Sequence, residues 1–246
     1  MYILFSPSEA KSDTSLYNSI NKNSFIFEDL YEIRQQALKK YQDYLNSADI
    51  DALKKLFGLK KETEIESYKS IDIFKAKTNK AILRYSGVGY EYLGYKNLLE
   101  DEKEFLDNHM IIFSNLFGPL LAKDKIPLYK LKQGERIGDF IFENFYRENF
   151  TNHLDKLLKD RLVIDLRASF YDKFYKPSTP FFSMKFLKNS KSVSHWAKAY
   201  RGMVAKELAK YKPKNEKELM NIEFKNLKIK EIKRSALKNE LIFDII

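Results

Sequence analysis

Hydrophobic and polar positions follow two periods along the chain, and each period predicts a different element. Short apolar runs predict buried strands, whereas apolar residues that recur every three or four positions predict amphipathic helices. The predicted strands are residues 2–5, 110–113, 126–131, 162–166, 181–187, 222–224, 227–232 and 241–246. The predicted helices are residues 25–45, 48–56, 102–109, 138–146, 150–158 and 192–211, with one more beginning near residue 60. Because both kinds of element alternate over the whole length, we expect one α/β domain over residues 1–246, with a mixed sheet flanked by helices.

The helix predicted for residues 192–211 has a continuous apolar face. That face holds Trp196, Tyr200, Met203, Val204, Leu208 and Tyr211. Arg201 lies at the edge of this stripe, and Lys198 is its neighbour one turn earlier. Gly202 follows directly, although a helix interior disfavours glycine. We therefore expect a close approach to the backbone beside these two cations. The alternative is a packed core helix whose lysines are solvated.

A glycine turn joins the helix at residues 48–56 to the helix that begins near residue 60, and the pair resembles a helix-hairpin-helix. In that motif hydrophobic residues hold the helices together, and backbone N–H groups at the turn face a DNA phosphate. The matching positions are Leu53, Leu56, Gly58 and Leu59, and the surrounding cations are Lys54, Lys55, Lys60 and Lys61. Lys60 stands where a second glycine is usual. We expect a helical subdomain near residues 28–75 that contacts DNA at this turn, although ordinary helix pairs share the pattern.

The positive charge of the chain is concentrated in its last third. The whole chain has a net charge of +10. Residues 173–246 contain 18 lysines and arginines against 7 aspartates and glutamates, whereas residues 1–172 contain 26 against 27. A one-sided positive field attracts polyanions, of which nucleic acid is the commonest. The alternative is a basic surface that only improves solubility.

Several classes of protein are disfavoured by what the sequence lacks. There is no cysteine, which excludes disulfides and thiolate metal sites and is compatible with a reducing cytoplasm. The histidines, His109, His153 and His195, match no ligand spacing, so we expect no metal site. Residues 87–89 lack the third glycine and the lysine of a nucleotide-binding loop. With no leader-like start and no run long enough to span a membrane, we expect a cytoplasmic protein without a cofactor, and we assign no catalytic residue.

Polar residues follow several of the predicted strands. In α/β sheets, ligand clefts gather at the strand ends. The strand-end residues are Ser6, Lys11, Ser114, Lys130 and Asp165, and Tyr90, Tyr171, Lys173, Lys198 and Arg201 would complete the cleft. A cationic cleft lined by aromatic rings suits a phosphate group or a nucleic-acid strand.

These segments together resemble the YaaA peroxide-stress proteins of bacteria over nearly the whole chain. The matching segments, in the family's order, are Ser6-Pro7 with Lys11; Gly87, Tyr90 and Leu93; Ser114 with Leu116, Phe117 and Gly118; Tyr129-Lys130-Leu131; Val163-Ile164-Asp165-Leu166 with Tyr171; and Ala197 to Met203. The last two are the most specific, being similar to Val-Ile-Asn-Leu-Ala-Ser-x-Glu-Tyr and Ala-Lys-x-Ala-Arg-Gly-Leu. Four acidic positions of the family pattern are Val88, Lys132, Ser169 and Phe170 here, which makes the cleft more basic.

The resemblance implies a protein that protects DNA and protein from oxidation during peroxide stress. The family is associated with limiting unincorporated iron. Its members are described as binding DNA through a helix-hairpin-helix and a positively charged cleft on an unusual α/β fold. No established catalytic reaction comes with the resemblance.

We therefore expect a monomeric DNA-binding protein that contacts phosphates with little sequence preference and limits iron-driven damage under peroxide stress. One alternative is an enzyme acting on a phosphorylated or nucleotide substrate. Its residues would be Ser6, Lys11, Asp165, Tyr171, Lys198 and Arg201. A further alternative is a protein that binds iron directly, which the lack of cysteine and of clustered histidine disfavours.

Overall fold

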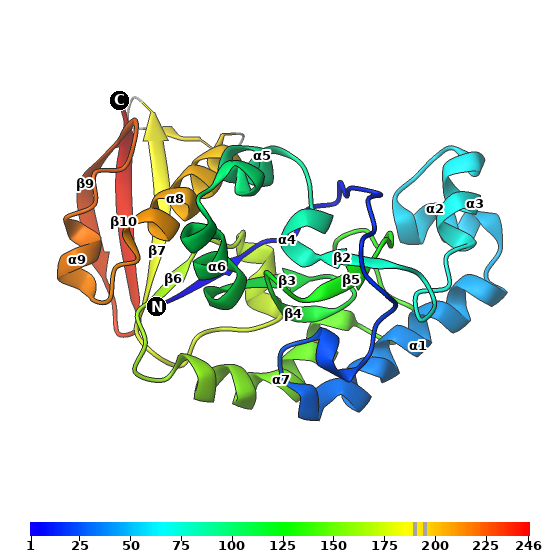
Figure 1. Cartoon of the computed structure of the whole chain (residues 1–246). Helices are drawn as coiled ribbons and strands as arrows, with labels where there is room; N and C mark the ends of the chain where they lie inside the picture. Colours follow the sequence, from blue (N-terminus) through cyan, green and yellow to red (C-terminus); the bar gives the residue numbers. More distant parts are fainter. Residues whose placement is uncertain (189–190, 194–195) are drawn as a thin grey trace.

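The main sheet of the computed structural model runs in the order β4-β3-β1-β6-β7-β10-β9, and β8 pairs with β7 (Figure 1). The structure describes residues 1–188, 191–193 and 196–246. The strands of this sheet are β1 (Tyr2–Phe5), β3 (Met110–Ser114), β4 (Gly118–Leu121), β6 (Val163–Asp165), β7 (Phe181–Lys188), β8 (Lys191–Ser192), β9 (Leu227–Arg234) and β10 (Lys238–Ile245). A separate antiparallel pair is formed by β2 (Thr78–Lys80) and β5 (Lys125–Pro127).

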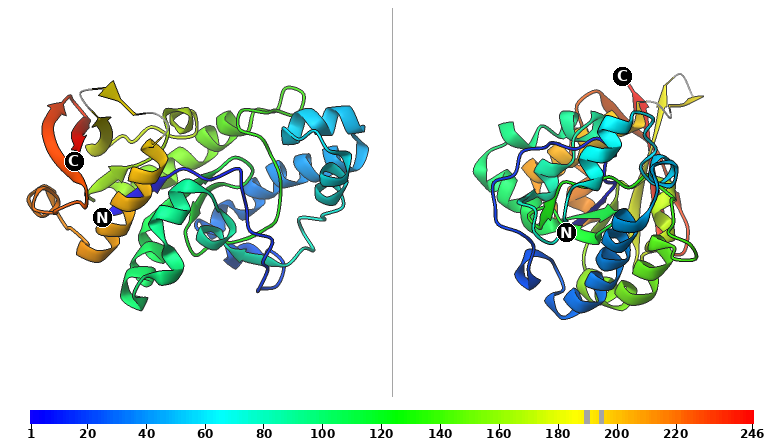
Figure 2. Two further views of the ribbon diagram at one scale, coloured as in Figure 1. Left: turned by 90° about the horizontal axis from the view of Figure 1, so that it is seen from above. Right: turned by 90° about the vertical axis from the view of Figure 1, so that its right-hand side faces the viewer.

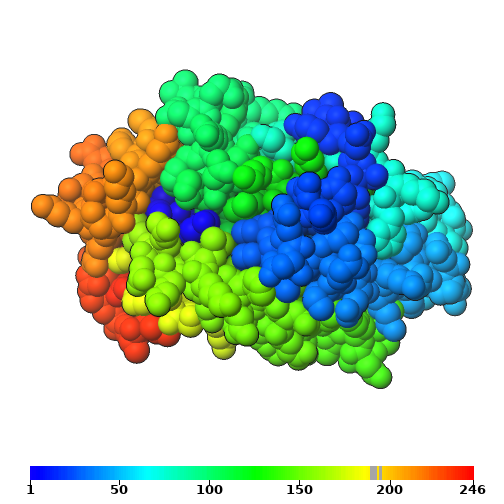
Figure 3. Space-filling view, turned by 60° about the horizontal axis from the view of Figure 1, so that its bottom comes forward, coloured from blue at the N-terminus to red at the C-terminus, as the bar shows by residue number. Residues whose placement is uncertain are grey.

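Helices cover both faces of the main sheet. The helices are α1 (Tyr31–Ser47), α2 (Ile50–Phe57), α3 (Glu62–Lys69), α4 (Ala81–Arg84), α5 (Val88–Leu93), α6 (Glu100–His109), α7 (Phe142–Leu158), α8 (Ala197–Tyr211) and α9 (Glu216–Met220). Of these, α2 and α3 form a hairpin away from the main sheet (Figure 1). Figure 2 shows α6 and α8 on one side of the strands and α7 on the other. On the α7 side, α1 and α7 lie side by side at the surface (Figure 3). The prediction of an α/β fold with a mixed sheet flanked by helices is confirmed.

β1 is the strand from which successive strands are added to opposite sides of the sheet: β3 lies on one side of it and β6 on the other. β3, β1, β6, β7 and β10 run parallel, with β4 and β9 antiparallel at the edges. β1 lies between β3 and β6, and in register Leu4 pairs with Ile111 on one side and Asp165 on the other. The carboxyl ends of β1, β3 and β6 therefore lie at one edge, where open α/β sheets place their ligands.

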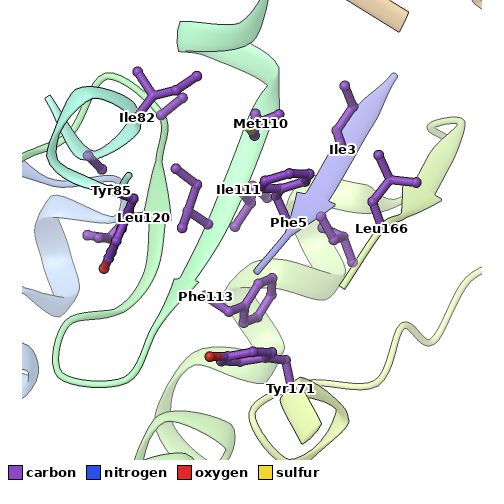
Figure 4. Close-up of a cluster of buried hydrophobic side chains, with 14 of the residues drawn as sticks. Ile3, Phe5, Ile82, Tyr85, Met110, Ile111, Phe113, Leu120, Leu166 and Tyr171 are labelled. Carbon is purple, nitrogen blue, oxygen red and sulfur yellow. The ribbon is translucent and has the colours of Figure 1, made fainter. Parts of the chain in front are cut away.

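Apolar side chains fill the centre of this sheet. Figure 4 shows Ile3 and Phe5 of β1 beside Ile111 and Phe113 of β3, with Leu166 on the other side of β1. All of them are buried. Parallel strands covered on both faces read as continuous apolar runs, which is why these strands could be recognised in the sequence.

A charged side chain also belongs to the core. Arg34 of α1 is fully buried, and its guanidinium lies 4.7 and 4.9 Å from the ring centroids of Phe25 and Phe150. Its Nη1 donates to Phe117 O, and its Nη2 donates to Pro119 O at 3.2 Å. These bonds tie α1 to the start of β4 and replace the water that a buried guanidinium loses. The sequence pattern of α1 gave no sign of this role.

Several predicted boundaries were wrong. The predicted helices 138–146 and 150–158 are replaced by one helix, α7, which begins at Phe142 and runs on to Leu158 because no glycine or proline interrupts it. The helix predicted from residue 25 begins at Tyr31, since Phe27 takes a left-handed conformation at φ 62°. The helix predicted for 192–211 begins at Ala197, and residue 192 lies in β8. Residues 222–224 form no strand, and of 126–131 only the first two lie in β5. Within the described ranges, no helix is both long and apolar enough to cross a membrane.

Candidate functional site

A cavity of about 450 Å³ opens beyond the carboxyl ends of β1 and β6. We call it the strand-end pocket. Its walls are formed by residues 5–9 at the end of β1, residues 87–90 at the start of α5, Leu166, Ala168 and Tyr171 after β6, and Gln133, Lys198 and Arg201. The position, beside the strand at which the sheet order reverses, is the one expected for a ligand site in this class of fold.

Two cations of α8 line the strand-end pocket. Arg201 is half-buried, whereas Lys198 is exposed. Among the residues that the structure describes, the Arg201 guanidinium makes no hydrogen bond and no salt bridge. Burial lowers the pKa of Arg201 below its ordinary value, while the negative charge of Asp165 acts in the opposite direction. A bound anion would replace the contacts with water that burial has removed, so this guanidinium is suited to receive a phosphate or carboxylate group.

Asp165 does not offer a free carboxylate to the pocket. The side chain of Arg167 holds it through two bonds, Nε to Oδ1 at 2.9 Å and Nη2 to Oδ2 at 2.7 Å. The Arg167 backbone N–H adds a third bond to Oδ1 at 3.0 Å. The Arg167 side chain, which is 1% exposed, also donates to Tyr171 O at 3.1 Å. Asp165 and Arg167 therefore form a buried ion pair that shapes the loop after β6, and Asp165 is not placed to act as a general base.

Ser6 and Tyr90 build the wall of the pocket through hydrogen bonds between segments distant in sequence. Ser6 Oγ accepts a bond from Ala168 N at 2.8 Å, which joins the end of β1 to the loop after β6. The Tyr90 hydroxyl donates to Ser6 O at 2.9 Å, and its ring packs edge-on against Phe5 at 5.5 Å between centroids. The Ser6 and Tyr90 hydroxyls therefore both make hydrogen bonds that join the walls of the cavity to each other.

A pair of lysines lies next to the pocket. Lys11 Nζ is 4.3 Å from the ring centroid of Tyr129 and donates to the carbonyls of Ser8 and Glu9 at 3.3 Å. Lys130 Nζ lies 3.4 Å from Glu9 Oε2. Burial, together with the nearby Lys130, lowers the pKa of Lys11 to about 7. Neither lysine lines the cavity, but both contact the segment that contains Ser8 and Glu9, and these two residues do line it.

Replacing Lys11 by methionine is expected to change how folding stability depends on pH. Because its folded pKa is about 7 and its ordinary value is 10.5, the unfolded chain carries more protons than the folded chain between these values. Relative to Lys11→Met, the wild type should therefore gain stability as pH rises through this window, by at most about 1.4 kcal/mol per pH unit. Urea unfolding of both proteins at about pH 7 and about pH 9.5 measures the difference. A difference that does not change with pH would contradict the lowered pKa.

The structure brings together only part of the cleft expected from the sequence. Ser6, Tyr90, Tyr171, Lys198 and Arg201 line the strand-end pocket, whereas Lys11, Lys130, Ser114 and Asp165 do not. Ser114 is fully buried and binds the hydroxyl of Tyr129 at 2.9 Å and the N–H of Phe117 at 2.9 Å, so it holds the turn after β3. Lys173 is exposed outside the pocket, over the ring of Phe170 at 4.9 Å.

Gly202 is required by another helix of the same chain. A Cβ atom at this position would lie 2.1 Å from the carbonyl oxygen of Gly89 in α5. The sequence indicated a close approach to the backbone here, and the approaching group is α5, not a ligand. The two glycines let α5 and α8 cross at short distance, which fixes two walls of the strand-end pocket relative to each other.

The hairpin at Gly58 is present, but the phosphate-binding geometry of a helix-hairpin-helix is not confirmed. The Gly58 N–H donates to Lys54 O at 2.9 Å and caps α2, so it does not face outward to a phosphate. Lys54 is paired with Asp51 at 3.0 Å and with Glu62 at 3.3 Å. The first turn of α3 contains Glu62 and Glu64, which would repel a phosphate. Lys61 lies 3.7 Å from Glu64, whereas Lys55 and Lys60 are exposed.

Replacing Gly58 by alanine is expected to lower the free energy of unfolding by about 1–2 kcal/mol, since a left-handed residue with a Cβ is strained. Gly58 has φ +66°, and the added Cβ would also lie 2.7 Å from Lys132 Cδ. Gly138→Ala is the matched control, because Gly138 has φ +57° and nothing within 4 Å of the added atom. We expect urea unfolding to show a cost for both variants and a larger one for Gly58→Ala. Equal costs would mean that Lys132 simply moves aside.

Some pocket residues were missed in the sequence. Val88 and Gly89 were not predicted to line the cleft, yet they lie in its wall. Glu9, Gln133 and Ala168 gave no signal at all. The usable signal was the pair of glycines at 87 and 89, which marks a segment whose backbone approaches another element closely.

The two histidines that the structure describes, His109 and His153, each pack or pair with a different neighbour. His109 is stacked on Phe105 at 4.6 Å between ring centroids, and His153 Nε2 lies 2.7 Å from Asp29 Oδ2. His195 lies outside the described residues. Within the described part of the chain, no group of three histidine, aspartate or glutamate side chains is placed to hold a metal ion.

Comparison with known proteins identifies the family. The sequence profile described as "Peroxide stress protein YaaA" matches residues 1–233. The chain belongs to the YaaA peroxide-stress family. It is 47% identical over 246 residues to an uncharacterized protein of Campylobacter jejuni, covering 100% of both chains. It is 27% identical to a UPF0246 protein of Fusobacterium nucleatum over 91% of each chain, and 29% identical to one of Corynebacterium glutamicum over 91% of this chain and 89% of the other.

Membership in the YaaA family confirms the resemblance read from the sequence and associates the chain with peroxide stress. The family description names a physiological role and no ligand.

Proposed function

We propose that this YaaA-family chain binds DNA during the bacterial response to hydrogen peroxide, with the strand-end pocket as its main phosphate site. The observation that carries the proposal is the half-buried Arg201 guanidinium, for which the described residues supply no partner. Arginine binds phosphate through parallel N–H bonds, and Lys198 adds a second cation. The protein would act as a cytoplasmic monomer and would limit iron-driven damage to DNA and protein.

The charge of the last third supports contact with a polyanion. α8, which supplies Arg201, belongs to the part of the chain with 18 basic against 7 acidic residues. Further exposed lysines lie on α8 and β9: Lys206, Lys210, Lys228, Lys230 and Lys233. Of these, Lys230 lies 3.4 Å from Asp244, and Lys233 lies 4.0 Å from Glu231. Contacts of this kind meet phosphates and do not read bases, so we expect little sequence preference.

A salt series tests DNA binding itself. Binding of a labelled duplex, followed by fluorescence anisotropy, should weaken linearly on a log–log plot of affinity against salt concentration, with a slope of about 0.9 for each phosphate neutralised. Two unrelated duplex sequences should give the same slope and similar affinity. An affinity that does not respond to salt, or no binding at low salt, would overturn the proposal.

The second candidate function is an enzyme acting on a phosphorylated or nucleotide substrate. The lysine pair favours it, because a Lys11 pKa of about 7 leaves an amine partly neutral near neutral pH, as a general base or nucleophile requires. Turnover of phosphorylated substrates, with Lys11→Met as the variant, tests this candidate. Loss of turnover with retained DNA binding would support it, whereas no turnover across phosphate esters and nucleotides would exclude it.

A further inference from the structure

The strand-end pocket is too small for a double helix and large enough for one nucleotide. Its volume of about 450 Å³ lies in the range of small-molecule sites. A duplex outside the cavity can meet the exposed Lys198. Arg201 is half-buried in the wall, so a phosphate has to enter the cavity to reach it.

The lining of the pocket offers both kinds of contact that a nucleotide needs. Phe5, Pro7, Leu166 and Ala168 and the rings of Tyr90 and Tyr171 supply apolar surface. A nucleobase is planar and largely apolar on its faces, and such surfaces are where proteins place bases. Both cations of the lining, Lys198 and Arg201, come from α8, so the groups that would hold a phosphate lie on one helix.

Two side chains add hydrogen-bonding groups for the edge of a base. Glu9 supplies a carboxylate. Among the described residues this carboxylate accepts only two long hydrogen bonds, from Lys130 Nζ and from Gln133 N, each at 3.4 Å. The exposed Gln133 carboxamide accepts from the Tyr171 hydroxyl at 3.5 Å and keeps its two N–H donors. Acceptors and donors at one cavity match the mixed pattern of a base edge.

The walls of the cavity are held before any ligand arrives. The bond from Ala168 N to Ser6 Oγ joins the loops after β1 and β6. The close approach of Gly89 and Gly202 joins α5 to α8. A preformed cavity lowers the cost of ordering a ligand.

We infer that the strand-end pocket binds a single nucleotide, with the phosphate at Arg201 and the base against the apolar wall. The claim that this nucleotide belongs to DNA rests on the proposed function, whereas binding of a free nucleotide does not. A nucleotide inside a regular duplex would first have to leave the base stack, at a cost of a few kcal/mol. DNA in which one nucleotide is already unpaired avoids this cost and should bind more tightly.

The experiment compares the whole nucleotide with its parts. By isothermal titration calorimetry on the full chain, deoxyadenosine monophosphate should bind at least about tenfold more tightly than either inorganic phosphate or deoxyadenosine alone, since only the nucleotide uses both parts of the cavity. A duplex with one bulged adenosine should bind at least about tenfold more tightly than the fully paired duplex. Deoxyadenosine monophosphate should compete with the bulged duplex.

Ala168→Phe is the test variant, because it fills the cavity and leaves every charged group in place. It should abolish binding of the mononucleotide and bring the affinity ratio of bulged to paired duplex close to one. Ala236→Phe is the matched control: Ala236 is exposed in the turn between β9 and β10, near the amino end of β7 and away from the pocket. It should keep the wild-type ratio. Should Ala168→Phe fail to fold, Val88→Phe fills the same cavity from an exposed position.

The outcomes separate this inference from the proposed function. Salt-dependent binding of both duplexes with equal affinity, with no binding of the mononucleotide, would overturn the nucleotide pocket and leave DNA binding intact. Binding of the mononucleotide that Ala168→Phe abolishes, without any binding of DNA, would support the pocket and overturn the proposed function. If neither ligand binds, both are wrong.

Discussion

Replacing Asp165 by alanine is expected to lower the free energy of unfolding by about 3–5 kcal/mol, because it leaves the buried charge of Arg167 with only Asp172, a half-exposed carboxylate 3.7 Å away. Arg167 is 1% exposed, and both side-chain bonds to Asp165 would be lost. For a chain of this length the cost corresponds to a fall of about 6–20 °C in melting temperature. Thermal and urea unfolding, followed by circular dichroism, measure it.

The matched control removes both charges at once. Asp165→Leu combined with Arg167→Met should be markedly more stable than Asp165→Ala alone, since no uncompensated charge stays buried. The opposite pattern, an Asp165→Ala protein with wild-type stability that no longer binds its ligand, would mean that Asp165 belongs to the binding site. That result would restore the role that the sequence first suggested for it.

Gly202→Ala is expected to destabilise the protein by at least about 2 kcal/mol, although alanine is the better helix former by about 1 kcal/mol. The added Cβ would lie 2.1 Å from Gly89 O, a backbone atom that can move only if α5 moves. Because α5 and α8 both line the strand-end pocket, ligand affinity should fall as well. Unfolding and ligand titration on the same preparation measure the two effects.

Gly89→Ala provides the graded control for this contact. Its added Cβ would lie 3.3 Å from Lys198 O and 3.7 Å from the ring of Phe5, a tighter fit than usual but without the overlap found at Gly202. We expect a clearly smaller loss of stability than for Gly202→Ala. A Gly202→Ala protein as stable as the wild type would show that α5 is free to shift and that the pocket walls are not fixed.

The central strands and the position of the pocket could be predicted because they follow from local patterns. β1 and β3 are buried on both faces and therefore read as apolar runs. β6 is parallel to β1 as well, so the carboxyl ends of these two strands meet at one edge, and Ser6 and Tyr171, which follow them, line the same pocket. The position of Arg201 at the edge of the apolar stripe of α8 was also visible in the helical period.

What could not be predicted is which charges neutralise one another. The pairing of Asp165 with Arg167 needs the backbone of the loop after β6 to bring two neighbouring side chains together in a buried place. Glu62 neutralises Lys54 across the hairpin turn, over a gap that no helical period describes. Counting lysines around Gly58 therefore overestimated the positive potential of the hairpin.

The strand-end pocket and the hairpin make opposite predictions for DNA binding, and a salt series on two double variants decides between them. We expect Lys198→Gln with Arg201→Gln to lower affinity for a duplex with one bulged nucleotide at least about tenfold and to reduce the log–log salt slope by about two units. Lys60→Gln with Lys61→Gln removes the same charge at the hairpin and should leave the slope close to wild type. If the hairpin pair flattens the slope while the pocket pair leaves it unchanged, DNA is bound at the hairpin and Arg201 is not its receptor.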